Sequence, residues 1–228
     1  MKNKTFWGFT LAEVLIAMAV IGVIAAITIP LIVENHKKIS VATQLKKFYS
    51  NTNQALKMYK TQAGEDLSDF TLPDKSSTTV LKFYEEALAP YMIDIGHKTY
   101  DGTFIGVQYN DGSGFYAYAN NTNLIHIFYC VEFRHCKPEG EGSMDGRNTF
   151  LFTIYFNKNQ YKGEMITSSN SYHSMSRDRL LSLCKYGNSD DASVSSQGRR
   201  HACARLIEID GWTIKPDYPW RQRTVPTS

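Results

Sequence analysis

Residues 8–14 read Gly-Phe-Thr-Leu-Ala-Glu-Val, and they open an apolar run that continues to Val33. Glu13 is the one ionisable residue between Phe9 and Val33. A carboxylate in the lipid part of a membrane helix costs on the order of 2.5–3.5 kcal/mol, so it requires a compensating group. A chain cut just before Phe9 would carry a free amine, which would give Glu13 of a neighbouring copy an ion-pair partner. The pattern therefore predicts a processed, self-associating membrane subunit rather than a catalyst.

The apolar run predicts the first part of one long helix. Residues 9–33 are long enough, at about 1.5 Å per residue, to cross a hydrocarbon layer roughly 30 Å thick. Pro30 is expected to bend this helix and to free a backbone carbonyl. From residue 34 the pattern becomes amphipathic, with one stripe at steps of three and four: Val41, Leu45, Phe48, Thr52, Ala55 or Leu56, and Tyr59. One helix is therefore expected from about residue 9 to residue 62, ended by Gly64.

The N-terminal stretch resembles the class III leader of type IV pilins and type II secretion pseudopilins. The resemblance rests on a set of residues ahead of the apolar run: Lys2, Lys4, Gly8, Phe9, Thr10, Leu11, Glu13 and Val14. It implies that a prepilin peptidase cuts after Gly8 and methylates Phe9, and that Glu13 guides each subunit into a filament. Pro30 lies where many members of this family have a helix-bending proline.

Two other interpretations of the same stretch are a secretory signal peptide and an uncleaved signal anchor. Ala17-Met18-Ala19 fits a signal-peptidase site, but it lies inside the apolar run instead of after it. A signal anchor explains the hydrophobicity and leaves the motif at residues 8–13 as a coincidence. We therefore expect residues 1–8 to be a leader, 9–33 a transmembrane or filament-core helix, 34–63 its amphipathic continuation, and 64–228 a globular head.

The head is predicted to be α+β with an antiparallel sheet, as in pilin-like proteins. Asp101-Gly102 and Asp111-Gly112 are turn signals. Strands are expected at 103–110, 114–119, 124–133 and 149–157, and helices at 80–92 and 174–185. Residues 200–209 are ambiguous between helix and strand, and Trp212 and Trp220 are expected to pin the C-terminal segment onto the head.

Charge and cysteine content indicate the compartment. The formal charge of +3 falls to +1 when Lys2 and Lys4 leave with the leader, so bulk charge gives no support for nucleic-acid binding. Lys2 and Lys4 favour a cytoplasmic N-terminus, whereas four lysines beyond the span compete with that orientation: Lys37, Lys38, Lys46 and Lys47. An even number of cysteines suits two disulfides in an oxidising compartment: Cys130, Cys136, Cys184 and Cys203.

The resemblance also bears on the pairing of these cysteines. Many pilin-like proteins close a C-terminal loop with a disulfide, and Cys184 with Cys203 resembles that pair. Cys130 and Cys136 would then pair locally, which requires a turn between them because six extended residues span roughly 20 Å. Three connectivities remain open. Zinc bound by the cysteines with His135 and His201 is a rival whose spacing matches no common finger, and calcium is a second option, with oxygen ligands at Asn188, Asp190, Asp191 and Ser193.

Nothing in the sequence favours catalysis or a cofactor. The chain lacks a Gly-x-Ser-x-Gly elbow, a phosphate-binding glycine loop and a His-Glu-x-x-His pair. The head aromatics fit sheet packing better than a ligand platform, and the basic cluster at Arg199, Arg200, His201 and Arg205 fits a solvated face better than a DNA contact. We therefore expect no enzyme, no cofactor, no bound metal and no nucleic-acid partner.

The predicted function is that of a structural subunit of a type IV pilus or a type II secretion pseudopilus, which the sequence does not separate. Its predicted partners are pilin-like subunits in a homo- or hetero-filament, the prepilin peptidase/methyltransferase and membrane lipid. The predicted location is the cytoplasmic (inner) membrane, with a single span and an extracytoplasmic head, and a periplasmic or cell-surface filament after assembly. The alternative is a membrane-anchored binding or sensor protein that does not polymerise.

Overall fold

The computed structural model describes residues 10–64, 66–68, 70–136, 144–157, 161–186 and 201–220. The chain divides into two compact units, Met1–Ser40 and Val41–Ser228. Helix α1 (Leu11–Ala63) contributes its first part to one unit and its second part to the other. Its bounds agree with the single long helix predicted from the sequence.

The part of α1 in the first unit has no core of its own. None of its residues from 11 to 40 is buried, and its large apolar side chains are exposed on all sides, from 40% at Val14 to 79% at Leu11. A helix that is apolar all round is stable only when lipid or other protein surrounds it. Helix α1 is long and apolar enough to cross a membrane.

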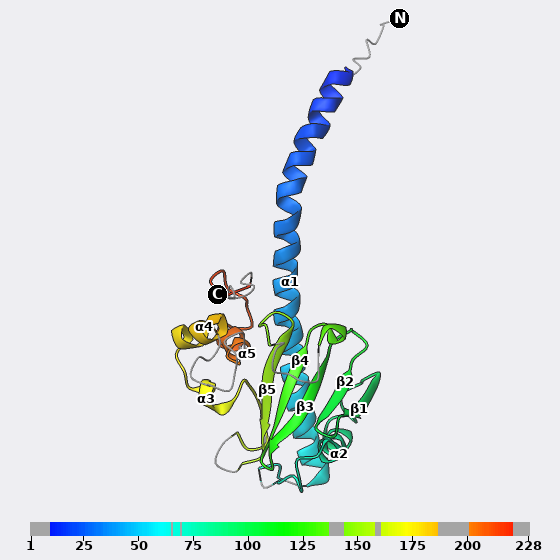
Figure 1. Ribbon diagram of the computed structural model, residues 1–228, viewed down its shortest axis with the longest axis vertical. Coiled ribbons are helices and arrows are strands. Elements are labelled where there is room, and N and C mark those ends of the chain that lie inside the picture. The colour runs from blue at the N-terminus through cyan, green and yellow to red at the C-terminus, as the bar shows by residue number, and fades with distance from the viewer. Residues whose placement is uncertain are drawn as a thin grey trace, which may run out of the picture. The chain divides into compact units, whose positions relative to one another are not determined.

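The part of α1 in the second unit, residues 41–63, carries the predicted amphipathic stripe. Val41, Ala42, Leu45, Phe48, Thr52, Ala55 and Leu56 are buried. The ring of Phe48 stacks on Tyr129 at a centroid distance of 4.4 Å and meets Phe152 edge-on at 5.2 Å. Residues 41–63 therefore pack across one face of the sheet and form part of the core of the head (Figure 1).

The sheet has six strands in sequence order, and every neighbouring pair is antiparallel. Its strands are β1 (Gly96–Tyr100), β2 (Phe104–Gln108), β3 (Gly114–Asn121), β4 (Leu124–Cys130), β5 (Thr149–Tyr155) and β6 (Met165–Thr167). The predicted Asp-Gly turns join β1 to β2 and β2 to β3, with Gly102 and Gly112 at φ 77° and 83°. The α+β class with a long N-terminal helix and an antiparallel sheet in the head is thus confirmed.

Strand alternation divides the head aromatics between the two faces of the sheet. One face contributes Phe115, Tyr129 and Phe152 to the main core with the helices. The other face has a smaller cluster of Phe128, Met144 and Leu151, which Phe104 and Tyr118 flank. Most of these rings are therefore used in packing, which agrees with the sheet-packing interpretation of the sequence.

The bounds of the remaining helices correct several predictions. These helices are α2 (Ser77–Ala87), α3 (Asn170–His173), α4 (Arg177–Tyr186) and α5 (Cys203–Ile209). Helix α2 starts before the predicted residue 80 because Ser76 caps it, accepting a hydrogen bond from the Thr79 amide. The ambiguous segment 200–209 contains the short helix α5.

The prediction missed two strands and extended a third too far. β1 is a polar, exposed edge strand, and β6 has only three residues, so neither shows the alternation of a half-buried strand. The strand predicted at 124–133 ends at Cys130, because a 3-10 turn (Phe133–His135) follows it. Tyr218 and Trp220 are buried, so the C-terminal segment is fixed to the head as its tryptophans indicated.

Candidate functional site

The N-terminal end of α1 holds the Glu13 carboxylate in a reciprocal cap. The Thr10 amide and hydroxyl donate to Glu13 Oε2 at 2.8 and 2.9 Å, and the Glu13 amide donates to Thr10 Oγ1 at 3.2 Å. This is the geometry of a capping box, in which residues three apart satisfy each other's free donors. The sequence signal, Thr-x-x-Glu ahead of an apolar run, was present but overlooked.

The cap leaves one side of the Glu13 carboxylate for another partner. All three bonds involve Oε2 or the Glu13 amide, and Oε1 has no hydrogen-bond partner among residues 10–64 of α1 and the other described segments. Thr10 and Glu13 are both exposed. The predicted processing residues Gly8 and Phe9, and the leader of which Gly8 is the last residue, lie outside the described residues.

Pro30 lies inside α1, which continues through it as a helix. Proline has no amide hydrogen and so cannot donate to the carbonyl of Ala26, four residues earlier. Two residues before Pro30, the Thr28 hydroxyl donates to the Ile24 carbonyl at 3.0 Å. A bend at Pro30 stays a prediction.

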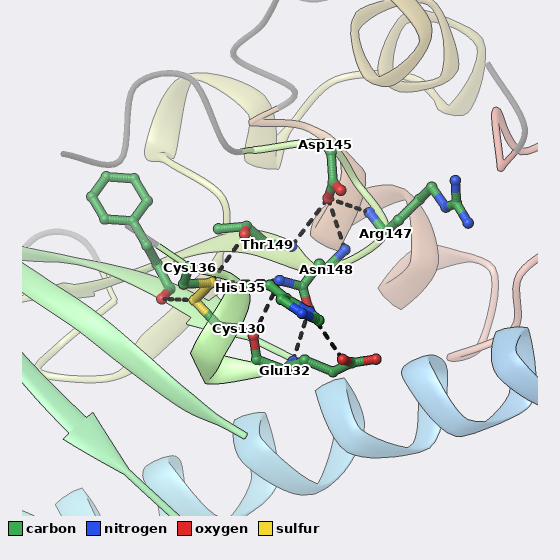
Figure 2. The surroundings of a disulfide bond; sticks show 9 residues. Cys130, Glu132, His135, Cys136, Asp145, Arg147, Asn148 and Thr149 are labelled. Atoms are coloured by element: carbon green, nitrogen blue, oxygen red, sulfur yellow. Dashed lines mark hydrogen bonds and ion pairs between the residues drawn. A yellow bond between two sulfur atoms is a disulfide. The ribbon is translucent and has the colours of Figure 1, made fainter. Parts of the chain in front are cut away.

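The first disulfide closes the connection that follows β4. Cys130 and Cys136 are joined across a Cα–Cα distance of 6.3 Å, and the 3-10 turn between them supplies the reversal that the sequence required. Asp145 then orders the segment before β5 by accepting the amides of Arg147, Asn148 and Thr149 (Figure 2). Asn148 and Thr149 lie against Cys136 Sγ at 3.6 and 3.3 Å.

The second disulfide joins α4 to α5, between Cys184 and Cys203. Gly146 lies so close to it that an added Cβ would be 2.6 Å from Cys203 Sγ, and its φ of 66° also favours glycine. The Gly146 carbonyl accepts the Tyr218 hydroxyl at 2.5 Å. The segment 144–149 therefore connects both disulfides and the C-terminal segment. The two disulfides, Cys130–Cys136 and Cys184–Cys203, are the pairs that the resemblance implied.

All four cysteines are in disulfides, so none of them is a thiolate that could bind zinc. Within the described ranges, no group of three or more His, Cys, Asp or Glu residues is arranged to hold a metal ion. The calcium candidates Asn188, Asp190, Asp191 and Ser193 lie outside the described residues, as do Arg199 and Arg200 of the basic cluster. Arg205 of that cluster pairs with Glu208 at 2.6 Å.

A charged cluster fixes the C-terminal segment to α4. Arg177 bonds Asp210 at 2.7 Å and Asp217 at 2.8 Å, and Lys215 also reaches Asp210 at 2.7 Å. Burial opposes ionisation of Asp210, but its bonds to Arg177 and Lys215 prevail and hold its pKa below the usual range. Each carboxylate is matched by a cation, so the cluster is structural and leaves no carboxyl poised for acid–base chemistry.

The fold and the N-terminal site define an α+β protein with a disulfide-bonded head and, among the residues described, one membrane-length helix. The family model of DUF6613, described as a family of unknown function, matches residues 31–222. Because the match covers most of the chain, the protein belongs to this family. The comparison with curated proteins gives no match, and the comparison with solved structures gives none either.

Proposed function

We propose that this protein is a structural subunit of a filament of the type IV pilus or type II secretion pseudopilus kind. The observation that carries the proposal is a lone carboxylate, Glu13, at the start of an apolar helix that is exposed on every side. A segment of this kind requires lipid before assembly and neighbouring helices after it. The head is extracytoplasmic in this proposal, which two disulfides support because they persist in oxidising compartments.

Assembly depends on charge pairing at the N-terminal end of α1. Cleavage between Gly8 and Phe9 creates an amine, and that amine of one subunit pairs with Glu13 of the next. The hydrogen bonds from Thr10 orient the Glu13 carboxylate before assembly, because they hold Oε2 and leave Oε1 for the amine. Losing one partner of such a pair is costly because the other charge is then left uncompensated in a medium of low dielectric constant.

A substitution series separates charge from capping. Gln at position 13 preserves the capping box, because Gln serves as well as Glu at that position, but it removes the charge. Thr10→Ala removes the cap and keeps the charge. We expect Glu13→Gln and Glu13→Ala to insert into the membrane normally and to be absent from sheared filaments, while Thr10→Ala assembles at a reduced level.

A tethered binding or sensor protein is the second candidate, and the capping box favours it, because helix capping alone would explain why Glu13 is present. The two candidates differ in the behaviour of Glu13→Gln. A purely capping role predicts that this variant behaves like the parent chain. Normal incorporation of Glu13→Gln into filaments would overturn the charge-pairing mechanism.

A further inference from the structure

The two disulfides of the head differ in how far solvent reaches them. Cys184 and Cys203 are both fully buried. Cys130 is also fully buried, whereas its partner Cys136 is partly exposed. Thiol–disulfide exchange begins when a thiolate approaches one sulfur of the disulfide, so access decides which disulfide reacts. Of the four cysteines, all of them described, Cys136 is therefore the one that an external thiolate reaches in the folded head.

Two side-chain donors face the sulfur of Cys136 (Figure 2). Thr149 Oγ1 lies 3.3 Å from Cys136 Sγ, and Asn148 Nδ2 lies 3.6 Å from it. A disulfide sulfur carries no proton, so the Thr149 hydroxyl and the Asn148 amide are the donors in these contacts. Donors of this kind stabilise a thiolate, because a hydrogen bond to the charged form of a group favours that form. After reduction, Cys136 is therefore the sulfur suited to carry the negative charge.

The surroundings of Cys130 favour the opposite protonation state. Its sulfur is buried and lies 3.5 Å from the Phe128 carbonyl oxygen, which is an acceptor. An apolar environment and a carbonyl acceptor both favour a neutral thiol. The reduced pair would therefore combine a buried thiol at Cys130 with an accessible thiolate at Cys136, an asymmetry that suits reversible exchange.

The turn between the two cysteines is held by contacts that do not involve sulfur. The Phe133 amide donates to the Gly112 carbonyl at 2.9 Å, and the Phe133 ring stacks on Tyr116 at a centroid distance of 4.8 Å. The Val131 amide donates to the Asn148 carbonyl at 2.8 Å. These contacts remain when the sulfur–sulfur bond is cut. The Cys130–Cys136 disulfide can therefore open while the head stays folded.

We propose that Cys130–Cys136 is a reversible thiol–disulfide exchange site, which an external dithiol reduces through Cys136. One thiolate of the dithiol attacks Cys136 Sγ, the bond to Cys130 breaks, and its electron pair goes to Cys130 Sγ, which takes a proton from water. The second sulfur of the dithiol loses its proton to water, attacks the first sulfur of the dithiol, and releases Cys136 as a thiolate. The dithiol leaves as a disulfide, and the protein gains two electrons. This exchange does not depend on filament assembly.

The test is timed reduction of the full chain in detergent at about pH 8, where thiolates form readily. Dithiothreitol is the first probe, and reduced thioredoxin is the second. Samples are quenched with acid, unfolded, labelled with N-ethylmaleimide and mapped by peptide mass spectrometry. Cys130 and Cys136 should be labelled at least roughly 10-fold faster than Cys184 and Cys203, because exchange requires access to a sulfur. Reduction by both probes identifies a site open to a protein dithiol, and reduction by dithiothreitol alone identifies a site for a small dithiol.

A substitution on β5 tests the thiolate expected at Cys136. Thr149→Val removes one donor, and it should raise the ratio of reduced to oxidised dithiothreitol needed for half-reduction of Cys130–Cys136 roughly 3- to 10-fold, the range for one lost hydrogen bond. Thr99→Val, on the exposed edge strand β1, is the control and should leave that ratio unchanged. The proposal is overturned if the parent chain opens both disulfides at the same rate or opens Cys184–Cys203 first. It is also overturned if Thr149→Val melts like the parent and needs the same ratio.

Discussion

The two parts of helix α1 share one backbone and differ in what their side chains require. Residues 11–33 expose large apolar side chains in every direction, whereas residues 41–63 bury a single stripe against the sheet. The rest of the chain can bury an amphipathic stripe. The side chains of a helix that is apolar all round are buried only when lipid or other molecules surround it. Residues 41–63 of α1 therefore form part of the head, whereas residues 11–33 require lipid or other molecules around them.

The largest effect on stability is expected in residues 41–63 of α1, which pack in the head. Phe48→Ala should lower the free energy of unfolding of the head by about 3–5 kcal/mol, because the ring stacks on Tyr129 and leaves a cavity when removed. Chemical denaturation followed by tryptophan fluorescence measures this loss. Ile21→Ala, in the exposed half, is the control and should leave the same transition unchanged.

Removal of the disulfides should destabilise only the head, and the loss in free energy of unfolding should increase with the length of the closed loop. Replacing Cys184 and Cys203 together by Ala should cost about 3 kcal/mol, because their loop spans 19 positions. Replacing Cys130 and Cys136 together should cost about 2 kcal/mol, because their loop spans only 6. Equal losses from the two double variants, measured by denaturation, would contradict the loop-size argument.

Acid should destabilise the head through His126. Burial lowers the pKa of this imidazole to about 4, and its Nδ1 lies 3.0 Å from Thr153 Oγ1. Between about pH 4 and pH 6.5 the unfolded chain binds more protons at this position, so the free energy of unfolding rises with pH, by at most about 1.4 kcal/mol per pH unit. Denaturation between pH 4.5 and pH 7 measures the slope, and His126→Gln should flatten it.

The smallest effect concerns the junction between the two parts of α1. Glu34 and Lys38 form an ion pair four residues apart at 2.9 Å. Such a pair contributes about 0.2–0.5 kcal/mol to a helix. Glu34→Gln should therefore raise amide exchange near residues 34–38 slightly and leave the melting of the head unaltered. A large shift in head melting would contradict this prediction.

Sequence patterns predicted the features with strong periodicity and missed those without it. The stripe from Val41 to Leu56 and the Asp-Gly turns were visible because burial and positive φ restrict residue choice. The edge strand β1 was not predicted, because its exposed, polar residues show no alternation of apolar and polar side chains. At the candidate site, the position of Glu13 in an apolar run was visible in the sequence, but the capping role of Thr10 was not inferred.

The most direct test of the whole account is the intact mass of the protein purified from its native membrane. We predict a chain that begins at Phe9 and carries one additional methyl group, since the partner that we propose for Glu13 is the amine made by that cleavage. A mature protein that retains residues 1–8, or one that begins after Ala19, would contradict it.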